Sequence, residues 1–314
     1  MRQRRYAAMD LGTNSARLAV VDVDDAGAWH LVADERIACR LGQNLERTGR
    51  LHPAARIRAV DALRVLTNRA RELEVEALRA VATYALRTAM DGPEFQAHVR
   101  VELGLDLEIL SGDAEARWVL RGARRHAAQL PFGALTCLDL GGGSLELARE
   151  AEPAPLAVSL PLGAVVTAAE LPIPAPEAAI AALRRAARQA LRTGAPAFER
   201  TATEPFAAGG TITAAARFCG ALAPLSGHTL SRDEVEAMLA RIAPLDLESR
   251  RRLPRLDPDR ADIIVSGLAV LAETMQHMGS ASLRVHEHGV REGLLAAMVA
   301  GEGRSGSDSM HRTV

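Results

Sequence analysis

The stretch MDLGTNS at residues 9–15 returns later in the chain as LDLGGGS at residues 138–144. The two aspartates, Asp10 and Asp139, are separated by about the length of one domain. Each copy follows a short apolar run, residues 6–9 or 134–138, and precedes a second β-rich run. This pattern is typical of two buried strands joined by a glycine turn. The chain therefore contains a strand–turn–strand unit twice, and we expect two related domains.

The order of the other predicted elements is also repeated. The first half continues with a strand over 29–37, a helix over 54–73, a strand over 78–83, a helix over 85–101, a strand over 105–110 and a helix over 113–125. The second half has strands over 135–140, 145–148 and 156–160, a helix over 177–192, a strand ending at Ala208, helices from Thr211, over 232–242 and over 259–278, a strand over 283–288 and a helix over 290–300. Three strands followed by strand–helix alternation predict an α/β fold with mixed sheets flanked by helices. We expect domains at residues 1–125 and 126–300, followed by a polar, disordered tail at 301–314.

The chain has 314 residues, and all 38 of its basic residues are arginine. Without lysine, a Walker-type phosphate loop, a protein-kinase site and Schiff-base chemistry are all excluded. The formal net charge of −1 provides no sequence-wide polycation, and 3% aromatic residues are too few for a base-stacking surface. We therefore expect a globular protein that does not bind nucleic acid.

Three cysteines, Cys39, Cys137 and Cys219, stand far apart and never in CxxC spacing. This pattern disfavours a disulfide framework or a zinc site and is typical of a reducing compartment. Asp10 interrupts the N-terminal apolar run before a signal-peptide core forms. No apolar run reaches the roughly 18 residues that a bilayer crossing needs. We expect a cytoplasmic protein with no membrane partner.

A glycine turn that is led by Asp and closed by Ser offers the groups that a phosphate–metal complex needs. Glycines let backbone N–H groups approach an anion, hydroxyls add donors, and the Asp at the strand end supplies a carboxylate to a metal ion. One such turn is equally well an ordinary structural turn, whereas two, one in each domain, favour phosphate binding in a cleft between the domains. The dinucleotide fingerprint GxGxxG is absent, and Gly12 stands where a haloacid dehalogenase needs its second Asp.

Two further strand ends carry polar or glycine-rich sequence. In SGDAEAR at residues 111–117, a predicted strand runs into a helix, and Asp113 is interpreted as a capping or dipole-compensating residue. For Glu115 that role and a role as general base both stay open. In AAGGT at residues 207–211, the free amides of a helix N-terminus can hold an anion, and a plain tight turn explains the sequence equally well.

These segments, in this order, resemble the exopolyphosphatase/guanosine pentaphosphate phosphohydrolase (Ppx/GppA) family of the actin/hexokinase-like (ASKHA) superfamily. The resemblance runs from about Tyr6 to Leu295. Besides the two turns it includes ATYALRTA from residue 82, SGDAEAR from 111, SLPLGA from 159, the GGT turn, RADII from 260 and REGLL from 291. Longer relatives carry a C-terminal domain with a His-Asp metal pair. This sequence has no His-Asp dipeptide and resembles the short two-domain form.

The resemblance implies two ribonuclease-H-like (actin-like ATPase) domains with a cleft between them, and a homodimer. It implies hydrolysis of a terminal phosphoanhydride with Mg²⁺ or Mn²⁺, with K⁺ as a further candidate cofactor. The substrate is expected to be inorganic polyphosphate or guanosine pentaphosphate, with release of orthophosphate. Glu115 matches the water-activating base, and Asp139 and Glu146 match metal-associated carboxylates, to which the turn analysis adds Asp10. The candidates for phosphate binding are Gly12, Thr13, Asn14, Ser15, Arg17, Arg87, Ser111, Gly141, Gly142, Gly143, Ser144, Gly209, Gly210 and Thr211.

Three positions depart from the family pattern. Ala114 replaces the first Glu of the usual pair, Leu145 replaces a Thr beside the metal-associated Glu146, and Asp91 replaces an Asn. The first departure keeps open a non-hydrolytic nucleotide- or alarmone-binding regulator beside the two hydrolase activities. A kinase of the same superfamily is disfavoured because neither sugar nor adenine motifs are found.

Handling of a long polyanion would require a basic track that leads from the cleft. The candidates are three arginine runs, at residues 121–125, 184–192 and 250–255. The middle run lies opposite Ile180 and Leu191 at helical spacing, as on any solvated helix face. A substrate track and a solvated face both stay open from the sequence.

Overall fold

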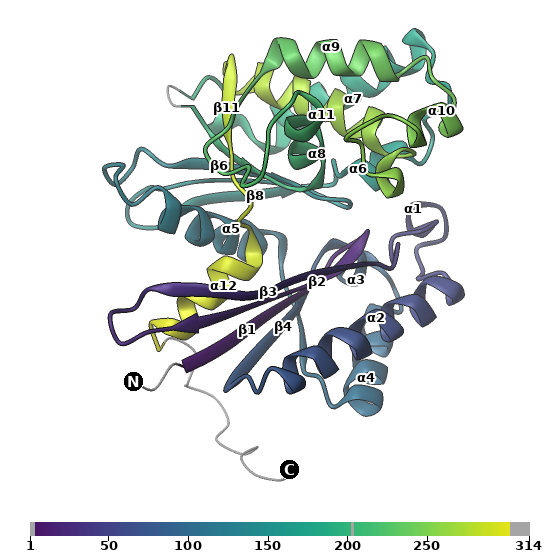
Figure 1. Ribbon diagram of the computed structural model, residues 1–314. Coiled ribbons are helices and arrows are strands. Elements are labelled where there is room, and N and C mark those ends of the chain that lie inside the picture. Colours follow the sequence, from purple (N-terminus) through teal and green to yellow (C-terminus); the bar gives the residue numbers. More distant parts are fainter. Residues whose placement is uncertain (1–3, 202–203, 302–314) are drawn as a thin grey trace.

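The structure is a computed structural model that describes residues 4–201 and 204–301. The described residues form two mixed sheets with helices between and outside them (Figure 1). The tail predicted at 301–314 lies, apart from Gly301, outside the described residues. Within the described ranges, none of the helices combines the length and apolar character that a bilayer crossing needs.

The first sheet has the strand order β3-β2-β1-β4-β5. An antiparallel meander of β1 (Arg4–Leu11), β2 (Ser15–Val23) and β3 (Trp29–Ala38) is extended by β4 (Ala77–Ala82), parallel to β1, and then by β5 (Leu107–Ile109). Side chains of successive strand residues point to opposite faces. Met9 and Leu11 therefore share a core with helix α2 (Pro53–Glu72), while Ala8 belongs to the core on the other face.

The second sheet repeats this plan with the order β10-β11-β9-β6-β7-β8. The meander consists of β6 (Thr136–Leu140), β7 (Leu145–Arg149) and β8 (Leu156–Leu160). It continues in parallel with β9 (Phe206–Ala208) and β11 (Ser282–Val285), and β10 (Thr229–Ser231) pairs antiparallel at the edge. The β6–β7 hairpin thus repeats β1–β2, as the two glycine turns predict. The predicted α/β class with two mixed sheets flanked by helices is confirmed.

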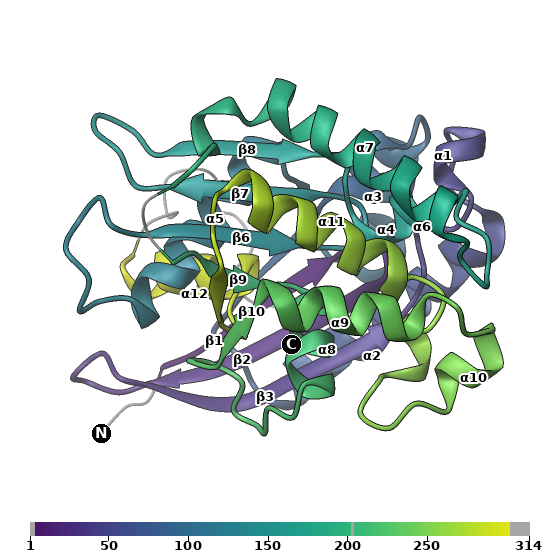
Figure 2. The same cartoon turned by 90° about the horizontal axis from the view of Figure 1, so that it is seen from above.

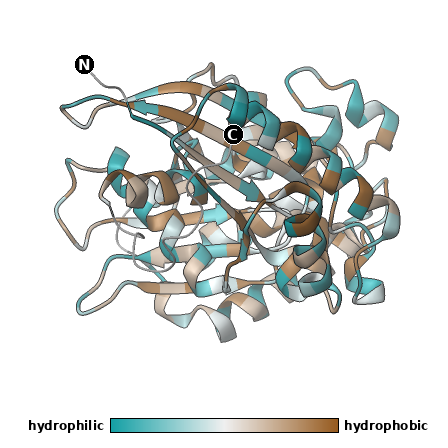
Figure 3. Cartoon of the chain, turned by 90° about the horizontal axis from the view of Figure 1, so that it is seen from below, coloured by the Kyte–Doolittle hydropathy of each residue, from teal (hydrophilic) through white to brown (hydrophobic). Residues whose placement is uncertain are grey.

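Helices cover the outer faces of both sheets, with α2 and α4 on the first sheet and α7, α9 and α11 over the second (Figures 1 and 2). Figure 3, a view from the side of the first sheet, shows both hydrophobic and hydrophilic residues along the helices that cover that sheet, as expected where one helix face packs on a core. The elements outside the sheets are α1 (Leu45–Thr48), α3 (Tyr84–Thr88), α4 (Gly92–Leu103), α6 (Ala164–Ala168), α7 (Glu177–Gly194), α8 (Gly210–Phe218), α9 (Arg232–Ile242), α10 (Leu247–Arg251), α11 (Ile264–His277) and two 3₁₀ turns, Pro196–Phe198 and Pro258–Arg260.

Two helices, α5 (Gly112–His126) and α12 (Val290–Val299), form the layer between the sheets (Figure 1). Their apolar side chains share one core with Ala8 of the first sheet and Cys137 of the second. Glycine lets the two helices approach closely, because a Cβ on Gly293 would lie 2.1 Å from the backbone of α5. The layer formed by α5 and α12 therefore holds the two sheets together.

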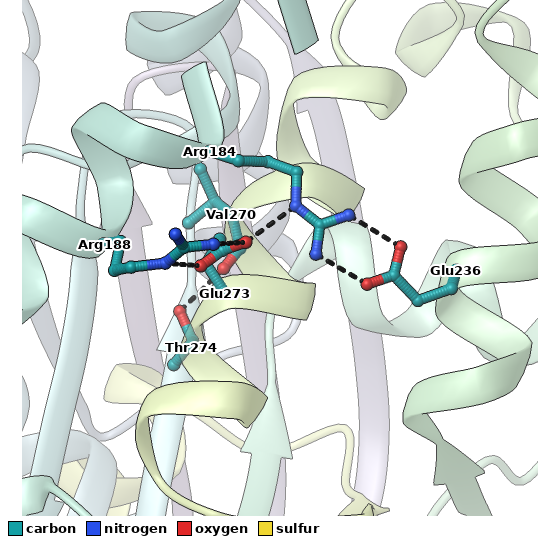
Figure 4. A network of polar contacts seen from close by, with 6 residues as sticks. All are labelled: Arg184, Arg188, Glu236, Val270, Glu273 and Thr274. Carbon is teal, nitrogen blue, oxygen red and sulfur yellow. Dashed lines mark hydrogen bonds and ion pairs between the residues drawn. The ribbon is translucent and has the colours of Figure 1, made fainter. Parts of the chain in front are cut away.

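A buried carboxylate on α11 ties the outer helices to each other. Glu273 is 1% exposed, and its oxygens accept hydrogen bonds from Arg184 and Arg188 of α7 at 2.7–3.1 Å (Figure 4). Arg184 also donates to both oxygens of Glu236 on α9. Arg184 and Arg188 of the middle arginine run thus neutralise a buried charge. Neither the substrate track nor the solvated helix face that the sequence suggested includes this role.

The other two arginine runs also contain structural residues. Arg124 forms an ion pair with the buried Glu150. The guanidinium of Arg125 lies 3.8 Å from the ring centroid of Trp29. Arg250 is fully buried and donates to a backbone carbonyl at 3.0 Å. A polyphosphate track along these runs would have to disrupt contacts that stabilise the fold.

Two predicted helices differ from the observed ones near the cleft. The helix predicted over 85–101 is two helices, α3 and α4, because proline is tolerated only in the first helical turn and Pro93 stands there. The preceding Asp91 accepts a hydrogen bond from the backbone of Leu51 at 3.0 Å. The helix predicted from residue 259 begins at Ile264, after a 3₁₀ turn. The short elements α1, α6, α10 and β10 were not predicted because they are too brief to show a period.

Candidate active site

Four side chains of the two hairpins point toward the space between the sheets. Asp10 lies opposite Arg17 in the β1–β2 pair, and Asp139 lies opposite Glu146 in the β6–β7 pair. The next-but-one neighbour of each on its strand belongs to the core between the sheets. Because strand side chains alternate, the four polar groups face the same space, just beyond that core. The internal repeat thus places two acid-led turns opposite each other.

The two turns have the same construction. The first glycine of each donates its N–H to the carbonyl of the closing serine at 3.0 Å, Gly12 to Ser15 and Gly141 to Ser144. This hydrogen bond fixes a tight loop in which further backbone N–H groups can face an anion.

Close contact between the turns requires glycine, since a Cβ on Gly143 would lie 2.3 Å from Oγ1 of Thr13. The turns border a cavity of about 110 Å³. Of the predicted residues, the cavity is lined by Asp10, Gly12, Thr13, Asn14, Ser15, Arg17, Glu115, Asp139, Gly141, Gly142, Gly143, Ser144, Glu146, Gly209 and Gly210. It is also lined by residues to which the sequence assigned no role, namely Thr83, Arg260, Gly289, Val290, Arg291 and Glu292.

Three predicted residues lie outside this lining. Arg87 reaches the site only through its contact with Glu115. Ser111 is exposed at the start of α5. Thr211 is buried against α11, where a Cβ on Gly267 would lie 2.4 Å from its Oγ1.

The N-terminus of α5 places the candidate base. Oγ of Ser111 accepts a hydrogen bond from the N–H of Ala114 at 3.2 Å, so Ser111 caps the helix. Asp113 and Glu115 follow in the first turn, where their charges complement the helix dipole. The interpretation of Asp113 as the cap is therefore wrong, because the serine two residues earlier occupies that position.

Glu115 is a buried carboxylate held by an arginine. Nη1 of Arg87 donates to its Oε2 at 2.8 Å. Burial and the charge of Glu146 raise the pKa of Glu115 well above its usual range, and Arg87 acts in the opposite direction. A carboxylate with a raised pKa is suited to accept a proton near neutral pH.

Three further carboxylates share the enclosed space. Burial raises the pKa of Asp10 to about 6 and that of Asp139 to about 6. Burial and the charge of Asp139 raise the pKa of Glu146 above its usual range. Oε1 of Glu146 accepts a hydrogen bond from the hydroxyl of Ser159 at 2.7 Å. The cavity therefore contains more negative charge than its immediate surroundings compensate.

These carboxylates fit a hard divalent cation. Mg²⁺ and Mn²⁺ prefer oxygen ligands, and Oδ1 of Asp10 is buried with no hydrogen-bond partner among the described residues. Within the described ranges, no group of three or more His, Cys, Asp or Glu side chains is arranged to hold a metal ion by itself. This arrangement suits Mg²⁺, which usually takes one or two carboxylates together with waters and substrate oxygens.

The cavity also contains arginines and unused hydrogen-bond donors beside the carboxylates. Arg291 donates to Asp34 at 2.6 Å. Nε of Arg17, Oγ1 of Thr13 and Nδ2 of Asn14 are buried and have no hydrogen-bond partner in the described part of the chain. Buried donors normally have partners, so an enclosed group of unused ones indicates an anionic ligand.

The turn before α8 adds a third arginine to the cavity. A Cβ on Gly210 would lie 1.9 Å from a guanidinium nitrogen of Arg260, so glycine allows that side chain to lie against the turn. Gly209 has a φ of +108°, and a Cβ there would lie 2.3 Å from the carbonyl oxygen of Leu140. Arg260 and Arg291 fall within the RADII and REGLL segments, but no periodicity in the sequence shows that they reach the cleft.

The Ppx/GppA phosphatase family matches residues 20–302 of the chain. Exopolyphosphatase 1 of Mycobacterium tuberculosis (strain ATCC 25618 / H37Rv) is 27% identical over 306 residues, which cover 93% of this chain and 87% of that protein. The guanosine-5'-triphosphate,3'-diphosphate pyrophosphatase of Aeromonas hydrophila is 28% identical over 301 residues, which cover 94% of this chain and 59% of that protein. The crystal structure of the Aquifex aeolicus Ppx/GppA family member has a TM-score of 0.78 at 25% identity and covers 97% of this chain and 100% of that one. Family, fold and the paired glycine turns agree, and the chain belongs to the Ppx/GppA phosphatase family.

Proposed function

We propose that the protein is a metal-dependent exopolyphosphatase, which hydrolyses the terminal phosphoanhydride of inorganic polyphosphate and releases orthophosphate. The proposal is carried by one observation: two glycine turns, unpartnered donors and the buried Glu115 border a single cavity. Phosphoryl transfer to water needs mainly positioning and charge neutralisation, and the cavity contains groups for both. Because the chain has no lysine, backbone amides, hydroxyls and arginine forks must hold the phosphate.

In the proposed complex, the terminal phosphate lies between the two turns. Backbone N–H groups of the turns donate to its oxygens, together with the hydroxyls of Thr13 and Ser144. The Nδ2 of Asn14 and the Nε of Arg17, both unpartnered among the described residues, supply further donors. Arg17 also offsets the negative charge of the phosphate.

Asp10, Asp139 and Glu146 are the residues proposed to hold Mg²⁺ or Mn²⁺. When bound, such an ion neutralises charge on phosphate oxygens. Burial raises the pKa values of Asp10 and Asp139 because it disfavours their charged forms, and a bound cation would act in the opposite direction by favouring those forms.

Glu115 is the proposed proton acceptor. The water oxygen bonds to the terminal phosphorus, the bridging P–O bond breaks with its electron pair on the leaving chain, and a water proton passes to the Glu115 carboxylate. Arg87 fixes the other side of that carboxylate through Oε2. Ala114 removes one carboxylate of the family pattern, but Glu115 keeps the buried position that the chemistry needs.

Removal of the 5′-terminal phosphate of guanosine pentaphosphate is the second candidate, favoured by the name of the Aeromonas relative. A non-hydrolytic nucleotide- or alarmone-binding regulator is the third, favoured by Ala114. A homodimer is proposed on the family resemblance alone, and the domain boundary at residues 125/126 is proposed on the repeated order of elements in the sequence. A cytoplasmic location is proposed on that resemblance and on three cysteines that form no disulfide.

Phosphate release from long-chain polyphosphate, guanosine pentaphosphate and ATP, each with and without Mg²⁺, tests the proposal. We expect Mg²⁺-dependent release that is fastest, by kcat/KM, from polyphosphate. Faster release from guanosine pentaphosphate would assign the second activity. Tight binding of guanosine pentaphosphate without release from any substrate would assign the regulator and overturn the hydrolase.

A further inference from the structure

A second chamber opens from the catalytic cavity behind the turn before α8. It has a volume of about 230 Å³. Six residues line both spaces, namely Arg17, Asp139, Gly209, Gly210, Arg260 and Gly289. Beyond these, the chamber is lined by Arg36 of β3 and Arg217 of α8. The two spaces therefore lie side by side against the same six residues, with Glu115 lining the first and Arg217 the second.

Four arginines gather around this second space, and we call Arg17, Arg36, Arg217 and Arg260 with the space they line the arginine chamber. Arg36 donates to Asp257 at 2.9 Å, and Nε of Arg260 lies 3.9 Å from the same carboxylate. Among the described residues, Arg17 and Arg217 form no ion pair. Burial, together with the charges of Arg36, Arg17 and Arg217, lowers the pKa of Arg260 to about 10. One carboxylate thus serves two of the four arginines.

The other acidic groups of the wall have partners elsewhere. Asp34 accepts a hydrogen bond from Arg291 at 2.6 Å. Glu287 accepts one from the backbone N–H of Leu225 at 2.9 Å. Asp139 faces the catalytic cavity, where it adds to the acidic cluster. The arginine chamber therefore contains four arginines beside four carboxylates, and Arg217 is an arginine of its wall that forms no ion pair with the described residues.

The other opening, of about 540 Å³, shares less of its wall with the catalytic cavity. Its lining shares only Asn14 with the described lining of the cavity. Arg40 donates there to both oxygens of Asp262, and Arg58 donates to the backbone carbonyl of Cys39 and to a glutamine side chain. Of the arginines that line this opening, Arg47 and Arg58 form no ion pair with the described residues, and Arg47 is the exposed one of these two.

We propose that the arginine chamber binds the phosphates behind the scissile bond. The anionic remainder of a linear polyphosphate, at least two further phosphates, runs from the glycine turns past Arg260 toward Arg217 and Arg36. Arginine forks hold such phosphates by charge-assisted, often bidentate hydrogen bonds. The inference rests on the proposed function and deepens it, because it assigns the site that recognises an inorganic chain rather than a single phosphate.

Binding of inorganic tripolyphosphate, measured by isothermal titration calorimetry in the presence of Mg²⁺, tests the chamber directly. The background is Glu115→Gln, which keeps the cavity and prevents turnover. Adding Arg217→Gln should weaken tripolyphosphate binding about tenfold, because one charge-assisted contact is lost. Adding Arg47→Gln instead removes the same charge from an equally exposed arginine at the other opening, and should leave binding unchanged.

Equal affinity with and without Arg217, or weaker binding after Arg47→Gln, overturns the arginine chamber. A parallel assay of the unsubstituted enzyme separates this failure from that of the proposed function. If the unsubstituted enzyme releases phosphate but Arg217→Gln leaves the affinity for tripolyphosphate unchanged, the arginine chamber is refuted and the proposed function is retained. Absence of release from every substrate, with tripolyphosphate binding that depends on Arg217, refutes the hydrolase and retains the chamber as a polyphosphate site.

Discussion

Nη1 of Arg87 donates to two oxygens at once, Oε2 of Glu115 and the backbone carbonyl of Leu110, each at 2.8 Å. Leu110 follows β5 and lies two residues before α5, while Arg87 belongs to α3. The guanidinium therefore connects α3 to the chain segment that enters α5 and fixes the carboxylate on that helix. Arg87 is a positioning residue in this arrangement, since it acts through Glu115.

Replacing Glu115 with Gln should reduce kcat by about 10²–10⁴-fold, the usual contribution of a general base. The amide keeps the size of the side chain, and burial disfavours the charged form of Glu115 more than Arg87 favours it, so the fold should be at least as stable. Phosphate release and thermal unfolding measured on the same preparation test both expectations.

Asp113→Asn is the matched control, because it removes the same charge from an exposed residue in the same helical turn. Its turnover should stay within about twofold, since exposed helix-terminal charges contribute only about 0.3–1 kcal/mol. Turnover of Glu115→Gln that resembles this control would exclude Glu115 as the base.

Removing the guanidinium with Arg87→Met should move the acid limb of the pH profile of kcat/KM to higher pH. Arg87 lowers the pKa of Glu115, so its loss raises that pKa further. The base is active only when deprotonated, and the variant must therefore reach a higher pH before it works. A uniform loss of rate across pH, with the limb unmoved, would mean that Arg87 has only a structural role.

Much of this arrangement could be predicted from the sequence because it is local. Because the turn is repeated, Asp10 and Asp139 hold equivalent positions on their strands. Successive side chains of a strand point to opposite faces, so the position of each aspartate decides which face it occupies. Arg260 could not be predicted in the same way, since its position depends on a turn 50 residues earlier that lacks a Cβ at Gly210. In the sequence, Glu273 is a polar residue within a mainly apolar predicted helix, and nothing there indicates its ion-pair partners. The arginines that pair with it are found only when α7 packs beside α11 in the structure.

The cavity carboxylates should make the metal-free protein more stable as the pH falls from about 8 toward 5, while His126, His286 and His288, whose pKa values are lowered by burial, act in the opposite direction. The pKa values of Asp10 and Asp139 are raised to about 6 in the folded state, and that of Glu146 is raised as well. The folded state therefore binds protons more tightly than the unfolded state, and unfolding becomes harder as these groups are protonated. Thermal unfolding in EDTA over this pH range measures the effect.

Mg²⁺ should reverse that trend, because a bound cation stabilises the ionised carboxylates and raises Tm most at pH 8. Glu146→Gln should raise the Tm of the metal-free protein at pH 8 and flatten its pH dependence. A Tm in EDTA that Glu146→Gln leaves unchanged at pH 8, with the same pH dependence as the unsubstituted protein, would contradict the shared burial of these carboxylates.

The double substitution Arg184→Ala/Arg188→Ala should destabilise the protein by about 3–5 kcal/mol, the cost of leaving a buried charge without its partners. Glu273, 1% exposed, would keep its charge among apolar residues of α11. Urea unfolding measures the loss, and kcat/KM of the folded fraction should be unchanged because the network lies outside the catalytic cavity.

Arg185→Ala/Arg192→Ala removes the same two charges from exposed positions of the same helix and should change stability by less than about 0.5 kcal/mol. A higher KM for long chains in this control pair would instead show that α7 contacts the substrate. Equal destabilisation by both pairs would exclude a special role for Glu273.

Two adjacent glycines should respond in opposite ways to alanine. At Gly210 the new Cβ meets only the far end of the flexible Arg260 side chain, at 1.9 Å, so the guanidinium is displaced while the backbone stays in place. Gly210→Ala should therefore raise KM for polyphosphate about tenfold and leave Tm unchanged or slightly higher, because alanine favours a helix over glycine by roughly 0.5–1 kcal/mol.

At Gly209 the new Cβ meets a backbone carbonyl at 2.3 Å, and the φ of +108° strains any other residue. Gly209→Ala should cost about 1–3 kcal/mol of stability. Kinetics and thermal unfolding of both variants decide the matter: a normal KM for Gly210→Ala would show that Arg260 does not bind substrate from its place against the turn.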